Sequence, residues 1–186
     1  MYRAATWWAM HNGVDLDDPE ALASITAQMP LEMTETDGTL QVSVGGKDIS
    51  RAIRTPDITR QIYRLDHVPG VRAHLVELQR AFGARRPTVA EGRDMGTVVF
   101  PNARWKIYLD ASVEERVRRR ADQLAQSGAG VDTAALKREI EERDHKNMTR
   151  AVSPLRRASD ARLLDTSELS FDEAVDAVVD IVREGA

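Results

Sequence analysis

Short apolar segments alternate with helical patterns in the second half of the chain, and this alternation limits the possible folds more than any other feature. From Arg86 onward, the segments "PTVAEGRD", "WKIYLDAS" and "ARLLDTS" each contain a short apolar strand. The second and third lead into predicted helices with capping boxes, in which Ser112 precedes Glu115, and Ser170 precedes Glu173, by three positions. Strands that alternate with helices indicate an α/β fold, in which helices flank a parallel sheet.

The first half of the chain predicts helices and a small antiparallel sheet. One helix begins near Tyr2 and stops at Gly13, and a second begins after Asp18, its predicted cap. In "LEMTETDGTLQVSVGGKDIS", alternating apolar residues and the turn dipeptides DG and GG predict an antiparallel meander. Two later helices carry apolar residues on one face: Val71, Leu75, Leu78 and Phe82 in the first, and Ala174, Val178, Ile181 and Val182 in the second.

Composition favours one globular domain over residues 1–186, without a general affinity for polyanions. The 186 residues are 42% hydrophobic and 30% charged, and 26 Lys and Arg stand against 30 Asp and Glu, a net charge of −4. The chain has no cysteine, which excludes disulfides and thiolate-bound metals and fits a cytoplasmic setting. It has no apolar run of about 18 residues, and its start lacks the pattern of a secretory signal. We therefore expect no membrane span and no nucleic-acid partner.

A charged quartet, Glu91-Gly92-Arg93-Asp94, follows the first of the predicted strands. Ligands of parallel α/β sheets bind just beyond the carboxyl ends of strands. Gly92 allows a close approach of the backbone to a ligand, Arg93 offers a planar fork for phosphate, and Asp94 can accept a hydrogen bond from an amino group. The alternative is an Arg–Asp pair on the surface, which contributes little stability. The pattern alone favours the two interpretations equally.

Arginines are dense on the two helices predicted after Ser112. They are Arg116, Arg118, Arg119 and Arg120 on the first, and Arg138, Arg143 and Arg150 on or just after the second. One interpretation is a solvated helix pair with salt bridges, since Glu139 and Arg143 lie one helical turn apart. The other is a mobile arginine-rich lid over a polyphosphate, with "SGAG" at residues 127–130 as its joint. Taken alone, the pattern favours the first.

The sequence contains no phosphate-binding P-loop of the form G-x-x-x-x-G-K-[S/T]. The nearest match, Gly46-Lys47, is followed by Asp48 and lies in the predicted meander instead of between a strand and a helix. The four histidines show no metal-ligand spacing, and neither G-x-S-x-G nor H-E-x-x-H occurs. Sites that depend on these motifs are therefore absent from the 186 residues.

Several stretches of the chain resemble the bacterial cytidylate kinase family. They are "MYRAAT", "DISRAIRTPDIT", "EGRDMGTVVFPNARWKIYLDAS" with the arginine helix after it, "REIEERDHKNMTRAVSPL" and "LLDTSELS". The resemblance covers essentially the whole chain and implies the fold of a P-loop nucleoside monophosphate kinase. It places a lobe for the nucleoside monophosphate, with the small antiparallel sheet, at residues 24–66, and a helical lid at residues 116–150. Family members carry the P-loop ahead of the segment that matches Met1, so we expect the first strand and first helix of the family fold to be missing.

The resemblance implies transfer of the γ-phosphoryl group of ATP, with Mg²⁺, to CMP or dCMP, which gives the diphosphate. The positions that match the family's CMP-binding residues are Arg3, Arg54, Arg72, Arg93, Asp94 and Asn147, and those that match its lid arginines are Arg143 and Arg150. Asp94 can accept from the N4 amino group of cytosine while Arg72 donates to N3 and O2, whereas uracil places a carbonyl against Asp94. The lid arginines neutralise charge on the transferring group.

At two positions the chain departs from the family pattern, so the resemblance does not predict its affinity for CMP or its preference between ribose and deoxyribose. Tyr63 stands where the family has a serine near the base, and Asn147 stands where it has an aspartate that contacts the ribose hydroxyl. Because the P-loop is absent, we expect this chain alone to be inactive with ATP, and the alternative is a non-catalytic CMP-binding remnant.

Association is the last property that the sequence addresses. Nucleic-acid binding through the arginine helices is disfavoured by the net charge and by the lack of aromatic residues among those arginines. The full-length form of the family is expected to be monomeric. We expect this chain to self-associate or to have low solubility, because a sheet that lacks its first strand exposes an edge and apolar surface.

Overall fold

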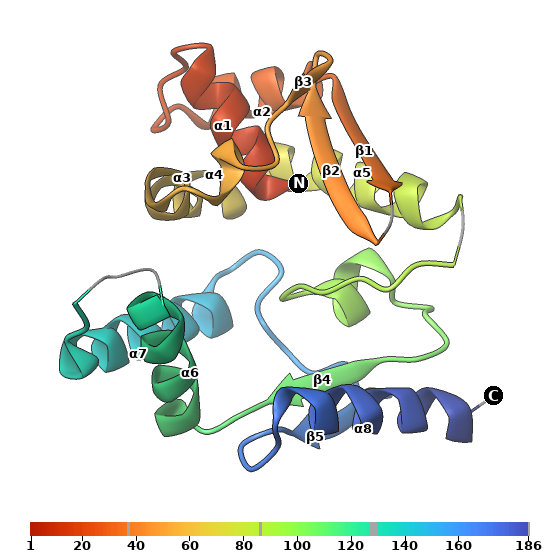
Figure 1. Cartoon of the computed structure of the whole chain (residues 1–186). Helices are drawn as coiled ribbons and strands as arrows, with labels where there is room; N and C mark the ends of the chain where they lie inside the picture. Colours follow the sequence, from red (N-terminus) through yellow and green to blue (C-terminus); the bar gives the residue numbers. More distant parts are fainter. Residues whose placement is uncertain (37, 86, 127–129, 186) are drawn as a thin grey trace. The chain divides into compact units, whose positions relative to one another are not determined.

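The computed structural model describes residues 1–36, 38–85, 87–126 and 130–185, which form two compact units, Met1–Val89 and Ala90–Ala186 (Figure 1). The helices and strands of the first unit are α1 (Tyr2–His11), α2 (Pro19–Ala27), β1 (Leu31–Thr36), β2 (Thr39–Val44), β3 (Lys47–Asp48), the 3₁₀ helix η1 (Ala52–Arg54), α3 (Pro56–Gln61), α4 (Tyr63–Asp66) and α5 (Pro69–Gly83). Those of the second are the π-helix η2 (Met95–Val99), β4 (Ile107–Asp110), α6 (Val113–Gln126), α7 (Thr133–Thr149), β5 (Arg162–Asp165) and α8 (Phe171–Glu184). Most of the predicted "SGAG" joint lies outside the described residues.

The core of the first unit is built around α1. Ala4, Ala5 and Ala9 are completely buried on this helix, and their small side chains let neighbouring elements approach closely. The predicted apolar face of α5 is confirmed, because Val71 and Leu75 are also completely buried. The core therefore fixes the positions of α1 and α5, the two helices that carry Arg3 and Arg72.

Helices α2 and α5 pack against each other at a glycine. A Cβ atom on Gly70 would lie only 2.6 Å from the Cβ of Ala23, whereas carbon atoms in contact are about 3.5 to 4.0 Å apart. The predicted cap of α2 is confirmed, since the Asp18 side chain accepts hydrogen bonds from the backbone N–H groups of Glu20 and Ala21. Asp18 thus sets the start of α2, as predicted, and Gly70 allows the close approach of α2 to α5.

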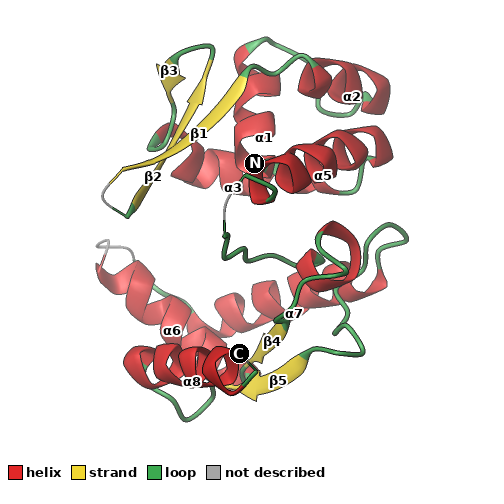
Figure 2. Cartoon of the chain, turned by 90° about the vertical axis from the view of Figure 1, so that its right-hand side faces the viewer, coloured by secondary structure: helices red, strands yellow, loops and turns green. Residues whose placement is uncertain are grey.

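The predicted antiparallel meander is also confirmed. β1 pairs with β2 from Leu31 opposite Val44 onward, and β2 pairs with β3 (Figure 2). Both turns use the left-handed backbone that glycine favours, with φ of +72° at Gly38, +58° at Gly45 and +74° at Gly46. The glycines of both predicted turn dipeptides therefore adopt the conformation that a chain reversal needs, while Asp37 lies outside the described residues.

The second unit contains the parallel pairing that the alternation of strands and helices predicts. β4 and β5 pair in parallel, with Ile107 opposite Arg162 and Asp110 opposite Asp165. α8 runs alongside these strands in Figures 1 and 2. Most other residues of α8 are exposed. The residues of its predicted apolar face are instead all half-buried, and they are Ala174, Val178, Ile181 and Val182.

The prediction of a strand at residues 88–90 is wrong. No strand is assigned to this segment, and Val89 in its middle is completely exposed. A strand needs a neighbouring strand to pair its backbone groups, and the described parallel sheet pairs β4 with β5. Shortly beyond, Met95–Val99 forms a π-helix, an element that the sequence did not predict and that occurs often at functional sites.

One of the two predicted capping boxes is complete. At the start of α8, Ser170 and Glu173 exchange both of the expected hydrogen bonds. At the start of α6, the Ser112 hydroxyl accepts from the N–H of Glu115 at 3.2 Å, but the N–H of Ser112 donates to the hydroxyl of Ser167 at 2.8 Å. The prediction of a full box is therefore wrong for α6, because the Glu115 carboxylate makes stronger, charge-assisted bonds to arginines.

Candidate functional site

Arg3 ties α1 to the segment that carries Arg54. Its guanidinium donates to the Ile53 carbonyl at 3.1 Å and to the Thr59 hydroxyl at 2.9 Å. Arg54 is the last residue of η1 and is exposed, and Thr55 then caps α3 by accepting from the N–H of Ile58. The first unit thus brings Arg3 to the segment that carries Arg54, another of the predicted CMP-binding residues.

Arg72 is the most buried of the predicted site arginines. Only 4% of this residue is exposed, and one Nη atom donates to the Asp66 carbonyl at 2.9 Å. Its guanidinium carbon lies 5.5 Å from the centre of the Tyr2 ring, within the range of a cation–π contact. Because Tyr2 adjoins Arg3 on α1, this helix positions both arginines.

Tyr63, which departs from the family pattern, lies on the surface of the first unit. It is 58% exposed, and the Arg64 guanidinium carbon lies 5.7 Å from its ring centre. Arg64 also forms an ion pair with Asp17. The Tyr63 ring is therefore available for stacking and takes no part in the buried core.

Asp94 is almost completely buried where the charged quartet ends. The residue is 5% exposed, and its backbone carbonyl accepts from the N–H groups of Val98 and Val99, at 2.9 and 3.2 Å. The space beside Gly92 holds the Met95 side chain, since a Cβ at Gly92 would lie 2.7 Å from the Met95 Cε atom. Gly92 therefore serves the packing of the π-helix, where the sequence suggested close approach to a ligand.

A cluster of like charges surrounds Arg93 in the second unit. Arg93 remains exposed, yet partial withdrawal of its guanidinium from water lowers its pKa, and repulsion from Arg143 lowers the pKa further. Arg116 and Arg150 act in the same direction, whereas Asp144 counteracts them. Arg93, Arg143 and Arg150 therefore lie near enough to interact electrostatically, and together with Arg116 they place four positive charges near one carboxylate.

Asp144 was not predicted as a site residue, and Arg116 was predicted only as one of the arginines of a possible lid. Asp144 is 7% exposed and forms an ion pair with Arg116, whose Nε also donates to the Ala111 carbonyl at 3.1 Å. The two charged residues lie on α7 and α6, 28 positions apart in the chain. No local spacing signals such a pair, so sequence patterns could not have found it.

Backbone contacts hold the end of α7, where Asn147 and Arg150 lie. The Nε of Arg150 donates to the Ser153 carbonyl at 2.7 Å, and Ser153 has a φ of +50°, which is uncommon for a residue other than glycine. The Asn147 carbonyl accepts from the N–H of Leu155 at 2.8 Å. The turn after α7 therefore fixes the side chain of Arg150.

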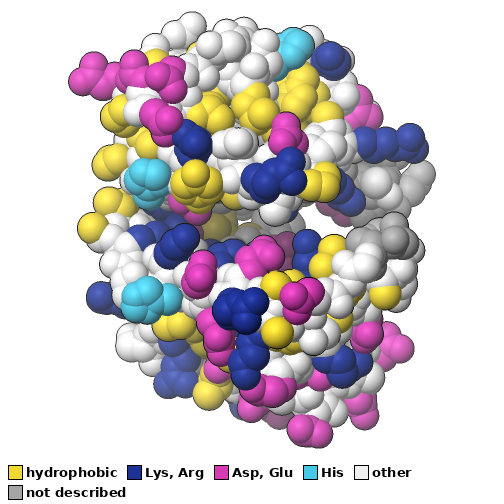
Figure 3. Space-filling model, turned by 90° about the vertical axis from the view of Figure 1, so that its left-hand side faces the viewer, with side chains coloured by type: hydrophobic (Ala, Val, Ile, Leu, Met, Phe, Trp, Pro, Cys, Tyr) yellow, Lys and Arg dark blue, Asp and Glu magenta, His cyan; other side chains and the backbone are white. Residues whose placement is uncertain are grey.

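Arg118 and Arg119 of α6 match the salt-bridge interpretation, whereas Arg120 donates to the side-chain oxygen of Gln123 at 2.6 Å. Arg118 contacts Glu115 and Asp122, and Arg119 contacts Glu115 and the Thr166 carbonyl. Hydrogen bonds from Arg118, and next from Arg119, lower the pKa of Glu115 to about 2. Figure 3 shows the same mixture on the face it draws, where Lys and Arg side chains are interspersed with Asp and Glu.

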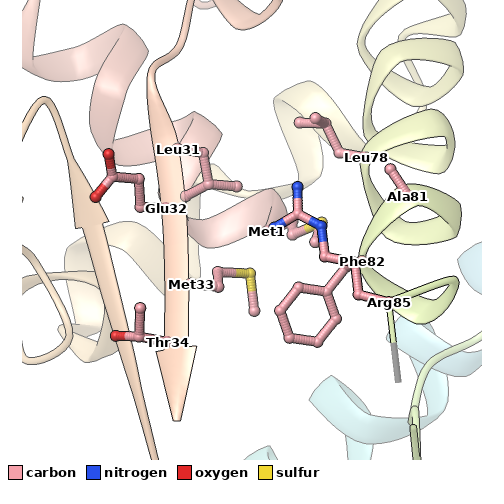
Figure 4. Close-up of a pocket in the computed structure, with 9 residues that line it drawn as sticks. All are labelled: Met1, Leu31, Glu32, Met33, Thr34, Leu78, Ala81, Phe82 and Arg85. Atoms are coloured by element: carbon pink, nitrogen blue, oxygen red, sulfur yellow. The ribbon is translucent and has the colours of Figure 1, made fainter. Parts of the chain in front are cut away.

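A separate cavity of about 290 Å³ lies between β1 and α5 in the first unit (Figure 4). Its lining consists of Met1, Leu31, Glu32, Met33, Thr34, Leu78, Ala81, Phe82 and Arg85. Met33, Phe82 and Arg85 point into the same space. The lining combines apolar side chains with Glu32, Thr34 and Arg85 and includes none of the predicted site residues, so we assign the cavity no role in nucleotide binding.

The described residues show neither a metal-ligand cluster nor a membrane-spanning helix. No group of three or more His, Asp and Glu side chains suited to a metal ion occurs within residues 1–36, 38–85, 87–126 and 130–185. In the same ranges, no helix combines the length and the apolar character that crossing a bilayer requires. We therefore assign no metal-ligand role to the described side chains.

Comparison with known proteins places the chain in a family. A model of the family described as cytidylate kinase matches residues 1–184. The cytidylate kinases of Klebsiella pneumoniae (strain 342) and Rhodococcus jostii (strain RHA1) are 41% and 44% identical, and each comparison covers 99% of this chain and 81% of the relative. A bifunctional pantoate ligase/cytidylate kinase of Synechococcus sp. (strain JA-2-3B'a(2-13)) is 44% identical, and the chain spans only 34% of its length. On this evidence, the chain belongs to the cytidylate kinase family.

Proposed function

We propose that the chain binds CMP or dCMP and serves the transfer of a phosphoryl group from ATP to it, giving the diphosphate. The observation that carries this proposal is the cluster of Arg93, Arg143 and Arg150 around one buried carboxylate. Three guanidinium groups in one place can balance the charge of a phosphate chain, and phosphoryl transfer depends mainly on such positioning and charge stabilisation. The family membership supplies the class of nucleotide.

Base recognition is assigned to Asp94 and Arg72. A carboxylate at Asp94 accepts from the N4 amino group of cytosine, and the Arg72 guanidinium donates to its N3 and O2 atoms. Both residues are withdrawn from water, at 5% and 4% exposure, and a buried polar group that meets the wrong base is left unpaired at a large cost. We expect uracil to be rejected for that reason.

The remaining roles follow the family pattern residue by residue. In the first unit, Arg3 binds the phosphate of CMP, and Arg54, which lies in the proposed lobe at residues 24–66, also contacts CMP. In the second, Arg143 and Arg150 belong to the proposed lid at residues 116–150 and bind the transferring group. Asn147 donates to, or accepts from, a ribose hydroxyl without adding charge.

ATP as donor and Mg²⁺ as its companion ion complete the proposal. Magnesium commonly keeps several waters and binds through one or two carboxylates and the phosphates of the nucleotide. The described residues offer no cluster for it, so no residue is assigned to the metal and no step depends on it. When bound with ATP, the ion neutralises phosphate charge.

Calorimetric titration with CMP and UMP tests the binding step. We expect CMP to bind in the micromolar range and UMP much more weakly, and Asp94→Asn to reduce this difference because an amide can also donate to a uracil carbonyl. Arg143→Ala should weaken CMP binding, whereas Arg118→Ala, which removes an exposed arginine paired with Glu115, should not. Equal affinity for CMP and UMP in the wild type would refute the assignment of the base.

Turnover separates a kinase from a CMP-binding protein. The 186 residues contain no G-x-x-x-x-G-K-[S/T] sequence, so we expect this polypeptide by itself to bind CMP without releasing ADP from ATP. A coupled assay of ADP release in the presence of CMP measures this directly. Turnover at the rate of a complete family member would show that phosphoryl transfer does not need that motif.

A further inference from the structure

Two ion pairs join α6 to α7 in the second unit, and they differ in burial. Glu114 and Lys137 form the first at 2.9 Å, and their side chains are 72% and 45% exposed. Arg116 and Asp144 form the second, in which the Asp144 side chain is only 9% exposed. An exposed pair contributes little to stability, whereas breaking a buried pair leaves an uncompensated charge. The buried pair is therefore the one that constrains the two helices.

Asp144 continues the buried stripe of α7. Leu136, Ile140 and Asp144 follow one another at intervals of four residues, and all three are buried. Residues at this spacing share one face of a helix. The stripe thus ends in a carboxylate beside Arg116 of α6, and this contact sets the rotation of α7 about its axis.

The rotation of α7 decides where its arginines lie. Arg143 directly precedes Asp144 on the helix, and Arg150 follows the last helical residue. Arg116 is anchored at two points, to Asp144 and to the Ala111 carbonyl that directly follows β4. Arg116 therefore links the end of β4 to α7, through its contacts with the Ala111 carbonyl and with Asp144.

We propose that Asp144 is a positioning residue, which through its ion pair with Arg116 fixes α7 against α6 and holds Arg143 and Arg150 near Arg93, so that the three can bind one phosphate chain. This inference rests on the proposed function, because it assigns Asp144 to the same phosphate-binding cluster. Asp144 touches no ligand in this role. Its effect on binding is transmitted through the geometry of the arginines.

Removal of the Asp144 charge distinguishes positioning from simple electrostatics. If Asp144 acted only through its charge, Asp144→Asn would strengthen anion binding, because a negative group near the arginines is lost. Positioning predicts the opposite sign, with inorganic pyrophosphate bound about tenfold more weakly by Asp144→Asn, since charge-assisted bonds depend on geometry. Asp144→Glu provides a second variant that keeps the charge but displaces Arg116, and it should also weaken binding.

The experiment is a calorimetric titration of the full chain with inorganic pyrophosphate, at a temperature well below each variant's unfolding midpoint. Glu114→Gln is the matched control, because it breaks the exposed pair between the same two helices, and it should bind pyrophosphate as the wild type does. Unchanged or tighter binding by folded Asp144→Asn or Asp144→Glu would overturn the inference, as would a wild type that does not bind pyrophosphate. A wild type that binds pyrophosphate with this dependence on Asp144 but does not bind CMP would support the inference and refute the proposed function.

Discussion

Replacing Gly70 by alanine should destabilise the first unit by forcing α2 and α5 apart. The added Cβ would lie 2.6 Å from the Ala23 Cβ, about 1 Å closer than carbon atoms in contact. Overpacking of this kind costs about 1 to 3 kcal/mol, and the better helix propensity of alanine returns at most about 1 kcal/mol. We therefore expect a net loss of about 1 to 2 kcal/mol in the free energy of unfolding.

Thermal unfolding followed by circular dichroism measures this loss. For a unit of this size, each 1 kcal/mol lowers the midpoint by roughly 4 to 8 °C. Ala23→Gly removes the opposing methyl group, so Gly70→Ala should cost much less, or stabilise, in that background. Such a cycle isolates the contact between the two residues. An unchanged or raised midpoint for Gly70→Ala alone would refute the reasoning.

Three further predictions concern charge, recognition and association. Hydrogen bonds from Arg118, and next from Arg119, lower the pKa of Glu115 to about 2, below its value in the unfolded chain. The Glu115 carboxylate therefore stabilises the fold fully above about pH 4.5, and this stabilisation is lost as the pH falls through 2. The difference in unfolding midpoint between wild type and Glu115→Gln should therefore shrink over that range, and a constant difference would contradict this. Because the Arg72 guanidinium lies over the Tyr2 ring, Tyr2→Leu should reduce the preference of the protein for CMP over UMP in calorimetry, and Tyr2→Phe, which keeps the ring, should preserve it. An equal loss of preference in both variants would argue against a role for the ring. The chain should self-associate in sedimentation velocity through exposed residues such as Leu109, 61% exposed, and Leu109→Thr should reduce this, whereas a monomeric wild type would disprove it.

Local signals in the sequence predicted most of the fold. Asp18, the glycine turns and the box of Ser170 with Glu173 act on backbone groups within a few residues, so their effect is visible in the sequence itself. The strand at residues 88–90 failed because a strand depends on a partner that is distant in sequence. The π-helix at Met95–Val99 was not predicted, because a single wider turn produces no repeating pattern of apolar residues that the sequence could show.

The candidate site was predicted less completely than the fold. The family resemblance supplied Arg93, Arg143 and Arg150, and the structure brings these three together in the second unit. Neither the resemblance nor the spacing pointed to Asp144 or to its contact with Arg116. Burial of a carboxylate among arginines is a property of helix packing, which no window of the sequence contains.

Arginine density alone does not show what each arginine pairs with, whereas the position of the nearest carboxylate does. Arg118 has carboxylates three and four positions away on its own helix, and local pairing uses its charge. The nearest partner of Arg116 is instead Asp144, on another helix and buried. A guanidinium that is paired within its own helix uses its hydrogen-bond donors locally. One whose partner lies on a different element joins the two, and can thereby hold other arginines in place for an anion.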